Sequence, residues 1–197
     1  VQLDGNIHLI GTQGVGKSTI LRAILFFYNA DTQRLGIPVE KKSYQDYYFP
    51  YADSSIIYEV AREDGWFTVL SYKTMNRICY RFIASPYRPD LFIDEEGAPY
   101  PSDRIRSVLD KNGIKYSGAI STYEEYRNIL YGNSDNKRDY SCYSLMESGS
   151  YQNIIRTIQN VLLNSRLEAD YIKQTIITSL NEADSVIDLS RYRSHLS

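Results

Sequence analysis

The chain has 197 residues, of which 43% are hydrophobic, and its formal net charge is −2. This length can bury one domain core with an appendage, and the nearly neutral total gives no overall attraction to nucleic acid, although a local basic face stays compatible with it. No signal peptide and no apolar run of membrane-spanning length is present, so we expect a cytoplasmic protein without a membrane partner. Cys79 and Cys142 match no zinc spacing, which predicts two reduced core thiols.

The most informative pattern lies near the N-terminus, where residues 11–18 read GTQGVGKS. This matches the phosphate-binding sequence GxxxxGK[ST], the P-loop. The apolar stretch 7–10 before it predicts a strand, and the run 19–25 after it predicts a helix. Glycines let backbone N–H groups turn toward phosphates, and the helix N-terminus adds the positive end of its dipole.

The residue types of this pattern fit the chemistry of a nucleoside triphosphate. Lys17 can reach the β- and γ-phosphates, and the Ser18 hydroxyl can hold Mg²⁺. The opposing interpretation is a chance glycine-rich turn before a helix, which would have to match the whole pattern and both flanks at once. The predicted site comprises Gly11, Thr12, Gln13, Gly14, Val15, Gly16, Lys17, Ser18 and Thr19.

The segments that follow alternate between loop and strand patterns. Residues 32–53 are polar and contain Pro38 and Pro50, which predicts a long loop. Three runs rich in β-branched and aromatic residues predict an antiparallel meander. They lie at 54–62, 66–72 and 77–84. We then expect a short strand at 91–93, a turn at 95–97, a helix with Ser102 as its N-cap that stops at Gly113, and a helix at 121–130.

Nineteen tyrosines stand out in the composition, and many lie within 44–51 and 116–151. Tyrosine rings can stack on nucleic-acid bases, but runs of arginine and lysine are not interleaved with them here. The composition therefore favours amphipathic packing over base stacking.

From residue 151 onward the apolar positions follow a helical spacing that approaches heptads. We therefore expect one domain at 1–150 and a helical region at 151–197. Periodicity alone leaves two interpretations open, a bundle helix packed on its own domain or the start of a coiled coil. The chain enters its first apolar stretch close to Val1 and stops within a helical pattern at Ser197, so we expect a segment of a longer protein.

Hydrolysis by a P-loop protein also needs an acidic residue at the end of an apolar strand. Asp94 follows a short apolar run, but Pro89 and Pro99 bracket it and Glu-Glu-Gly after it indicates a hairpin turn. Residues 147–152 resemble the ABC-type signature only faintly, and they follow Asp94 instead of preceding it. We therefore assign no catalytic residue and predict a nucleotide site without a hydrolytic half.

This order of features resembles the N-terminal ATPase head lobe of SMC/Rad50-like proteins, an α/β P-loop NTPase fold of ABC type with an antiparallel meander and the start of a coiled coil. Residues 1–18 resemble the strand, turn and P-loop of that family, 54–84 its meander, and 92–113 its strand, turn and helix. The later part is most similar to the MukB/MksB branch, which includes the JetC component of the Wadjet anti-plasmid system. The stretches that carry this similarity are 120–132, 138–147 and 151–163.

The resemblance implies an ATPase with ATP and Mg²⁺ in a composite site, completed by a C-lobe and by the signature of a second head in a homodimer. It also implies a kleisin and accessory subunits, double-stranded DNA as partner, a nucleoid-associated location, and head engagement that drives DNA loop handling or anti-plasmid defence. The family glutamine that helps to hold Mg²⁺ is missing from 116–122, so we leave that ligand unassigned. Arg34, Lys41 and Lys42 are candidates for the basic residue that reaches the nucleotide.

Two alternatives stay open. One is a Rad50-like repair ATPase with a nuclease partner. The other is a self-contained P-loop kinase or GTPase-like enzyme that uses Asp94 as its acid.

Overall fold

The computed structural model describes residues 10–32, 35, 37, 40–75, 77–132 and 140–145. The chain divides into two compact units, Val1–Tyr151 and Gln152–Ser197, and every described residue lies in the first. The predicted helical region 151–197 and its coiled coil lie outside the described residues, as do residues 7–9 of the predicted first strand. Ile10, the described end of that stretch, is not in a strand and is 93% exposed.

Three antiparallel strands in the order β1-β2-β3 form the sheet. They are β1 at Ser55–Arg62, β2 at Gly65–Lys73 and β3 at Ile78–Ile83. In this register Leu70 of the central strand lies opposite Ile57 on one side and Arg81 on the other. The predicted meander is therefore confirmed, and with the helices around it the described part is a mixed α/β structure.

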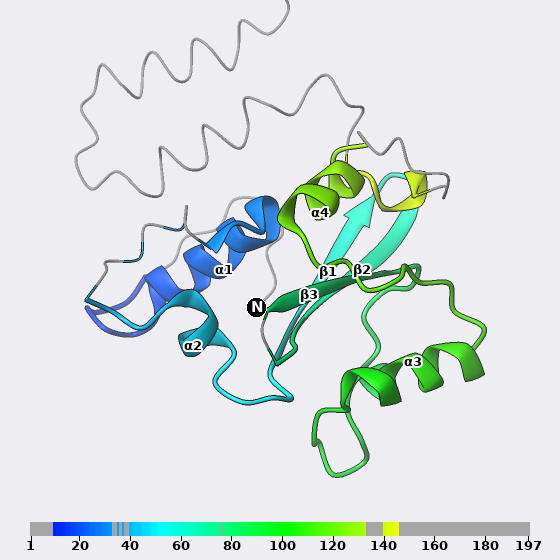
Figure 1. The fold of residues 1–197 in the computed structure, drawn as a ribbon, viewed down its shortest axis with the longest axis horizontal. Coiled ribbons are helices and arrows are strands. Elements are labelled where there is room, and N and C mark those ends of the chain that lie inside the picture. The colour runs from blue at the N-terminus through cyan, green and yellow to red at the C-terminus, as the bar shows by residue number, and fades with distance from the viewer. Residues whose placement is uncertain are drawn as a thin grey trace, which may run out of the picture. The chain divides into compact units, whose positions relative to one another are not determined.

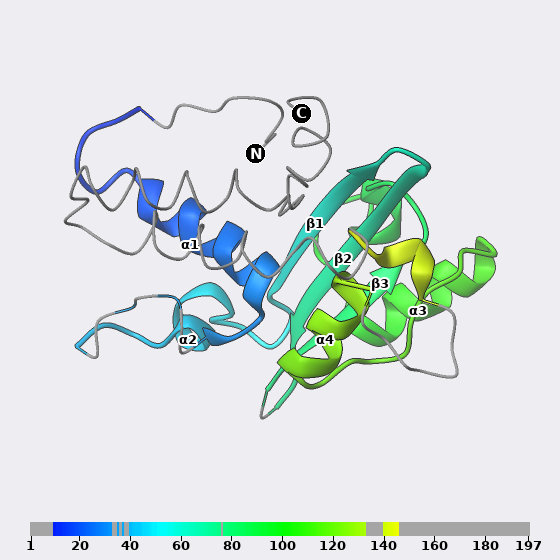
Figure 2. The ribbon, with the colours of Figure 1, turned by 90° about the horizontal axis from the view of Figure 1, so that it is seen from above.

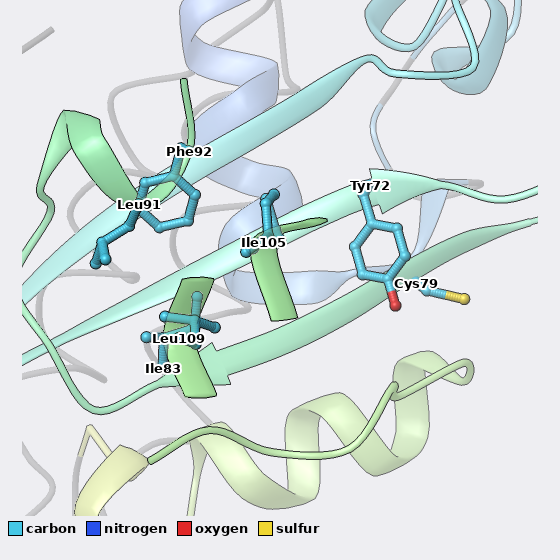
Figure 3. Packing of buried hydrophobic residues seen from close by; sticks show 8 residues of the cluster. Tyr72, Cys79, Ile83, Leu91, Phe92, Ile105 and Leu109 are labelled. Carbon is cyan, nitrogen blue, oxygen red and sulfur yellow. The ribbon is translucent and has the colours of Figure 1, made fainter. Parts of the chain in front are cut away.

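One face of the sheet packs against the segment that follows β3. Here a 3-10 turn, η2 at Pro89–Leu91, leads to helix α3 at Ser102–Lys111. Their apolar side chains meet those of alternate strand residues in one cluster, which Figure 3 shows from close by. The cluster consists of Leu70, Tyr72, Cys79, Ile83, Leu91, Phe92, Ile105 and Leu109.

The opposite face packs against helix α1 at Lys17–Asn29, helix α4 at Tyr123–Leu130 and the 3-10 turn η3 at Ser141–Tyr143. Figures 1 and 2 show α1 and α4 on the side of the sheet away from α3. The contacts are aromatic: the Tyr126 ring lies 4.5 Å from Tyr80 and 5.3 Å from Phe82, and Phe82 lies 5.5 Å from Tyr143. Both faces of β3 are thus covered, which explains why all of its residues are buried.

The structure corrects the prediction of a continuous loop at 32–53. Helix α2 occupies Tyr44–Tyr48 within this segment. The Ser43 hydroxyl accepts a hydrogen bond from the Asp46 N–H at 3.1 Å, which caps the first turn. The Tyr44 ring stacks on Phe26 of α1 at 4.4 Å, so a contact across the fold stabilises a helix too short to form alone.

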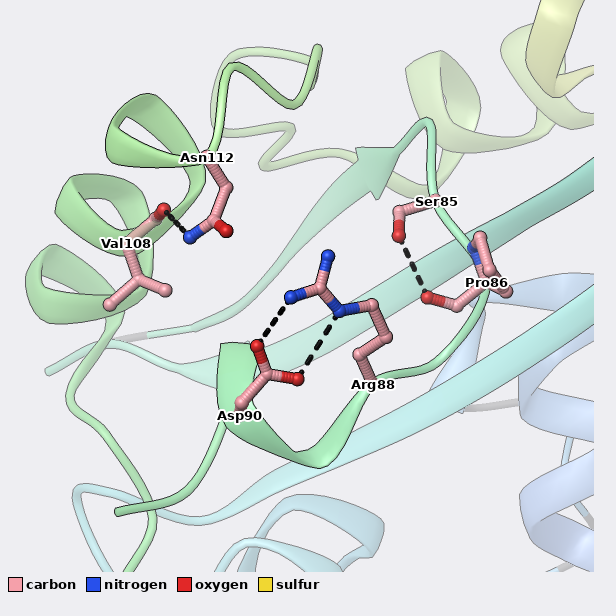
Figure 4. Close-up of polar contacts among 6 residues, drawn as sticks. All are labelled: Ser85, Pro86, Arg88, Asp90, Val108 and Asn112. Atoms are coloured by element: carbon pink, nitrogen blue, oxygen red, sulfur yellow. Dashed lines mark hydrogen bonds and ion pairs between the residues drawn. The ribbon is translucent and has the colours of Figure 1, made fainter. Parts of the chain in front are cut away.

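The predicted strand at 91–93 is also wrong. Leu91 ends the 3-10 turn, and only Ile93 forms a single bridge, to Pro99. Arg88 and Asp90 form an ion pair at 2.5 Å at the start of this turn (Figure 4). The 3-10 turn places the Leu91 side chain in the cluster against the sheet, where it is buried. This packing explains why the segment forms a turn although its sequence pattern indicated a strand.

Helix ends and cysteines also differ in detail from expectation. The N-cap of α3 is Pro101, with Ser102 as the first helical residue, whereas Gly113 ends the helix in a left-handed conformation as predicted. The Asn112 side chain donates to the Val108 carbonyl at 2.8 Å at this end (Figure 4). Cys79 is a buried free thiol, as predicted, but Cys142 is exposed, so the prediction of a second core thiol is wrong.

Candidate nucleotide-binding site

The loop at residues 11–16 has three positions that only glycine can occupy without strain. Gly14 and Gly16 both have φ of 91°, in the left-handed region. Gly11 faces a different constraint, because a Cβ built there would lie 2.7 Å from Cγ2 of Val15. The three glycines of the sequence pattern are therefore each required by the geometry of the loop.

Helix α1 begins directly after this loop without a side-chain cap. Its N-cap is Gly16, and its first turn contains no acidic residue. Within the described part, Gly16 therefore offers the first N–H groups of the helix no side-chain acceptor, and no carboxylate of the first turn lies at the positive end of the dipole. This arrangement favours an anion at the start of α1.

Lys17 folds back over the loop. Its ammonium donates hydrogen bonds to the carbonyl oxygens of Gly11 and Thr12, each at 2.6 Å. The positive charge is thereby held above the turn whose N–H groups a phosphate would contact. A lysine in this position can exchange a carbonyl acceptor for a phosphate oxygen at small cost, because both are hydrogen-bond acceptors.

The remaining predicted residues differ in accessibility. Thr12, Gln13, Val15 and Ser18 are exposed, so a ligand in solution can reach the loop and the Ser18 hydroxyl. Thr19 is half-buried, and its carbonyl accepts a hydrogen bond from the Tyr48 hydroxyl at 2.8 Å. No three His, Cys, Asp or Glu side chains of the described part gather into a metal-binding group. Mg²⁺ at this loop would therefore rest on Ser18 and on phosphate oxygens.

Asp94 lies in a different environment. Its Oδ1 accepts hydrogen bonds from the N–H groups of Glu96 at 3.0 Å and Ala98 at 2.7 Å, and Gly97 completes the turn with φ of 84°. The segment before it packs on the α3 side of the sheet, whereas α1 packs on the other side. The structure confirms the predicted hairpin turn and does not bring Asp94 to the P-loop.

The candidates for further nucleotide and ion contacts are only partly placed. Lys41 and Lys42 are exposed in the segment that leads to α2, and Arg34 lies outside the described residues. In the stretch 116–122, the Ser117 hydroxyl accepts from the Phe82 N–H at 3.0 Å. Thr122 caps α4 by accepting from the Glu125 N–H at 3.2 Å. Both hydroxyls therefore form hydrogen bonds within the fold, and the Mg²⁺ ligand that corresponds to the missing glutamine stays unassigned.

Sequence reasoning missed what the tyrosines do around α1. Tyrosine hydroxyls from five described positions donate to backbone carbonyls of α1 or of the residue after it. The pairs are Tyr48 with Thr19, Tyr58 with Ala23, Tyr126 with Phe27, Tyr131 with Tyr28, and Tyr80 with Ala30. Carbonyls of the last turn have no partner within a helix, so the bonds to Phe27 and Tyr28 satisfy two acceptors that the helix itself leaves without one. The predicted packing role of tyrosine is confirmed, and these hydroxyls also bind backbone carbonyls of α1 and of Ala30.

None of the helices in the described part combines the length and the apolar character that a bilayer crossing demands. Over residues 1–195 the chain matches the model of a family described as "Protein of unknown function (DUF3584)". No curated protein and no solved structure matches the chain.

Proposed function

The chain belongs to the DUF3584 family across nearly its whole length, and from the geometry of its own residues we propose that it binds ATP with Mg²⁺ through the P-loop at residues 11–18. The observation that carries this proposal is the combination of a glycine-dependent loop, Lys17 folded across that loop, and a helix start without a cap or a carboxylate. Backbone N–H groups would contact the phosphates, Lys17 would contribute its charge, and Ser18 would hold the ion.

We further propose that the site is one half of an ATPase. The only acidic residue that the sequence offered for hydrolysis, Asp94, has its carboxylate engaged in its own turn on the α3 side of the sheet. The acid that completes the site would then come from the C-lobe of an SMC-like head, and the signature from a second head. In this scheme ATP joins two heads when it binds and releases them when it is hydrolysed, a cycle that linkage between binding and association permits.

The proposed setting is an α/β P-loop NTPase of the ABC type, in an SMC-like protein that handles double-stranded DNA. The order of the glycine-dependent loop, the meander and α3 along the chain supports this proposal. We propose the MukB/MksB/JetC branch, with a kleisin, accessory subunits and nucleoid association, on the resemblance of residues 120–132 and 138–147. A Rad50-like repair ATPase remains the alternative within the same class, and the presence of a nuclease partner distinguishes it.

The direct test replaces Lys17. We expect Lys17→Ala to abolish binding of ATP and Mg²⁺, measured by isothermal titration calorimetry, because the loop then loses the charge that opposes the β- and γ-phosphates. Lys111→Ala is the matched control, since it removes the same charge from an exposed position at the end of α3. Unimpaired ATP binding by Lys17→Ala would contradict the proposal that this loop binds the phosphates of ATP.

A second variant separates the composite ATPase from a self-contained enzyme. Asp94→Asn removes the carboxylate charge but keeps an oxygen that can accept the N–H groups of Glu96 and Ala98. We expect this variant to retain the ATP turnover of the unchanged protein. Loss of ATP turnover with intact ATP binding would instead favour the hypothesis of a self-contained kinase or GTPase-like enzyme that uses Asp94 as its acid.

A further inference from the structure

Helix α2 is held beside the end of α1 that carries the P-loop. Figures 1 and 2 both show α2 alongside α1, and the Tyr48 hydroxyl ties it to the Thr19 carbonyl at 2.8 Å. Thr19 is two residues after Lys17, which corresponds to about 3 Å along a helix axis. Residues of α2 therefore lie next to the place where we propose that phosphates bind, within the reach of a nucleoside.

A series of aromatic rings fixes the position of α2. Phe26 of α1 stacks on Tyr44 with ring centroids 4.4 Å apart, and Tyr44 stacks on Tyr48 at 4.1 Å. Phe26 and Tyr44 are buried. Because Tyr48 bonds to Thr19 whereas Tyr44 meets Phe26, the series runs along α1 from its C-terminal half toward the P-loop.

Tyr47 lies at the outer end of this series. Its ring packs edge-on against Tyr48, with centroids 5.0 Å apart and an interplanar angle of 67°. Nevertheless 55% of Tyr47 is exposed. An aromatic ring that is positioned by its neighbours and still open to solvent presents a π-face at low entropic cost.

We propose that Tyr47 is the residue on which the base of the bound nucleotide stacks. This inference rests on the proposed function, because it takes the phosphates to be held by the P-loop. Stacking on an aromatic ring tolerates every base, so the contact adds affinity for a nucleoside without selecting adenine over guanine. It also assigns a ligand contact to a tyrosine that composition alone placed among packing residues.

The test compares ATP with inorganic tripolyphosphate, which carries the phosphates but no base. Both ligands are titrated with Mg²⁺ into the unchanged protein and into Tyr47→Ala, Tyr47→Phe and Tyr51→Ala by calorimetry. Tyr51 is the matched control because it is 72% exposed in the turn after α2, and within the described ranges no stacked ring connects it to α1.

We expect Tyr47→Ala to weaken ATP binding about fivefold to a hundredfold, the range for loss of one base stack, and to leave tripolyphosphate binding unchanged. Tyr47→Phe and Tyr51→Ala should bind both ligands like the unchanged protein. Equal ATP affinity of Tyr47→Ala and the unchanged protein overturns the inference, and so does an equal loss for both ligands, which would indicate a structural role of Tyr47. Failure of the unchanged protein to bind either ligand overturns the proposed function itself.

Discussion

The packing of Gly11 against Val15 gives the sharpest prediction about the P-loop. A Cβ at Gly11 would lie 2.7 Å from Val15 Cγ2, whereas carbon atoms in favourable contact are about 3.5–4.0 Å apart. Valine is stiff at χ1, so the loop or the side chain must move to relieve the overlap. Overpacking of this kind costs about 1–3 kcal/mol. If the cost falls on the loop conformation that binds the ligand, Gly11→Ala weakens ATP binding about fivefold to a hundredfold.

Val15→Ala removes the atom with which the new Cβ would collide. The double variant Gly11→Ala/Val15→Ala should therefore bind ATP close to the level of Val15→Ala alone, as measured by calorimetry with Mg²⁺. Gly16→Ala is the control, because a Cβ there meets nothing within 4 Å but the φ of 91° is itself strained for any other residue. Val15→Ala should not restore that variant. Normal binding by Gly11→Ala, or equal restoration of both glycine variants, would refute the reasoning.

Two further predictions concern the tyrosines around α1. Tyr126→Phe should lower the free energy of unfolding by about 1–3 kcal/mol in urea denaturation, because the buried Phe27 carbonyl loses the donor that lies 2.6 Å away. Tyr123→Phe is the control and should have almost no effect, because Tyr123 is half-exposed. Equal stability of the two variants would contradict this prediction. Burial raises the pKa of Tyr58 and of Tyr80, because it disfavours the charged phenolate in the folded protein. The contribution of these two residues to the free energy of unfolding is therefore complete below the unfolded pKa of about 10 and is lost as the pH rises above it. Urea denaturation at about pH 8 and about pH 11 checks the second prediction, which fails if the midpoint does not decrease.

The glycine-dependent loop at residues 11–16 and the meander could be predicted because their signals are local. The spacing of Gly11, Gly14 and Gly16 before Lys17 encodes a left-handed turn and an uncapped helix start, and both are present. The strand runs are rich in β-branched and aromatic residues and are separated by short polar turns, which predicts antiparallel pairing without knowledge of the rest of the fold.

Helix α2 and the segment at 91–93 could not be predicted because contacts across the fold decide them. Tyr48 bonds to a residue 29 positions earlier in the chain, and Tyr44 stacks on Phe26. Leu91 forms a turn instead of a strand because its burial against the sheet outweighs the local apolar pattern. Composition likewise predicted a packing role for tyrosine, but not which carbonyl each hydroxyl meets, since the Tyr126 partner lies 99 positions away.

The tyrosine hydrogen bonds divide α1 into two halves that differ in their freedom to open. Four of the five carbonyls that accept them lie at Ala23 or beyond, and the buried side chains of the helix begin at Leu25. Among the tyrosine hydroxyls of the described part, only that of Tyr48 bonds to the half that begins at Lys17, and this half follows an exposed loop. Local opening should therefore need less free energy at Ile20, whose N–H donates to the Gly16 carbonyl at 3.1 Å, than at Phe27, and amide hydrogen exchange should slow along the helix in that order. The loop at residues 11–16 can consequently adjust around the nucleotide that we propose it binds, while the half of α1 that packs on the sheet stays in place.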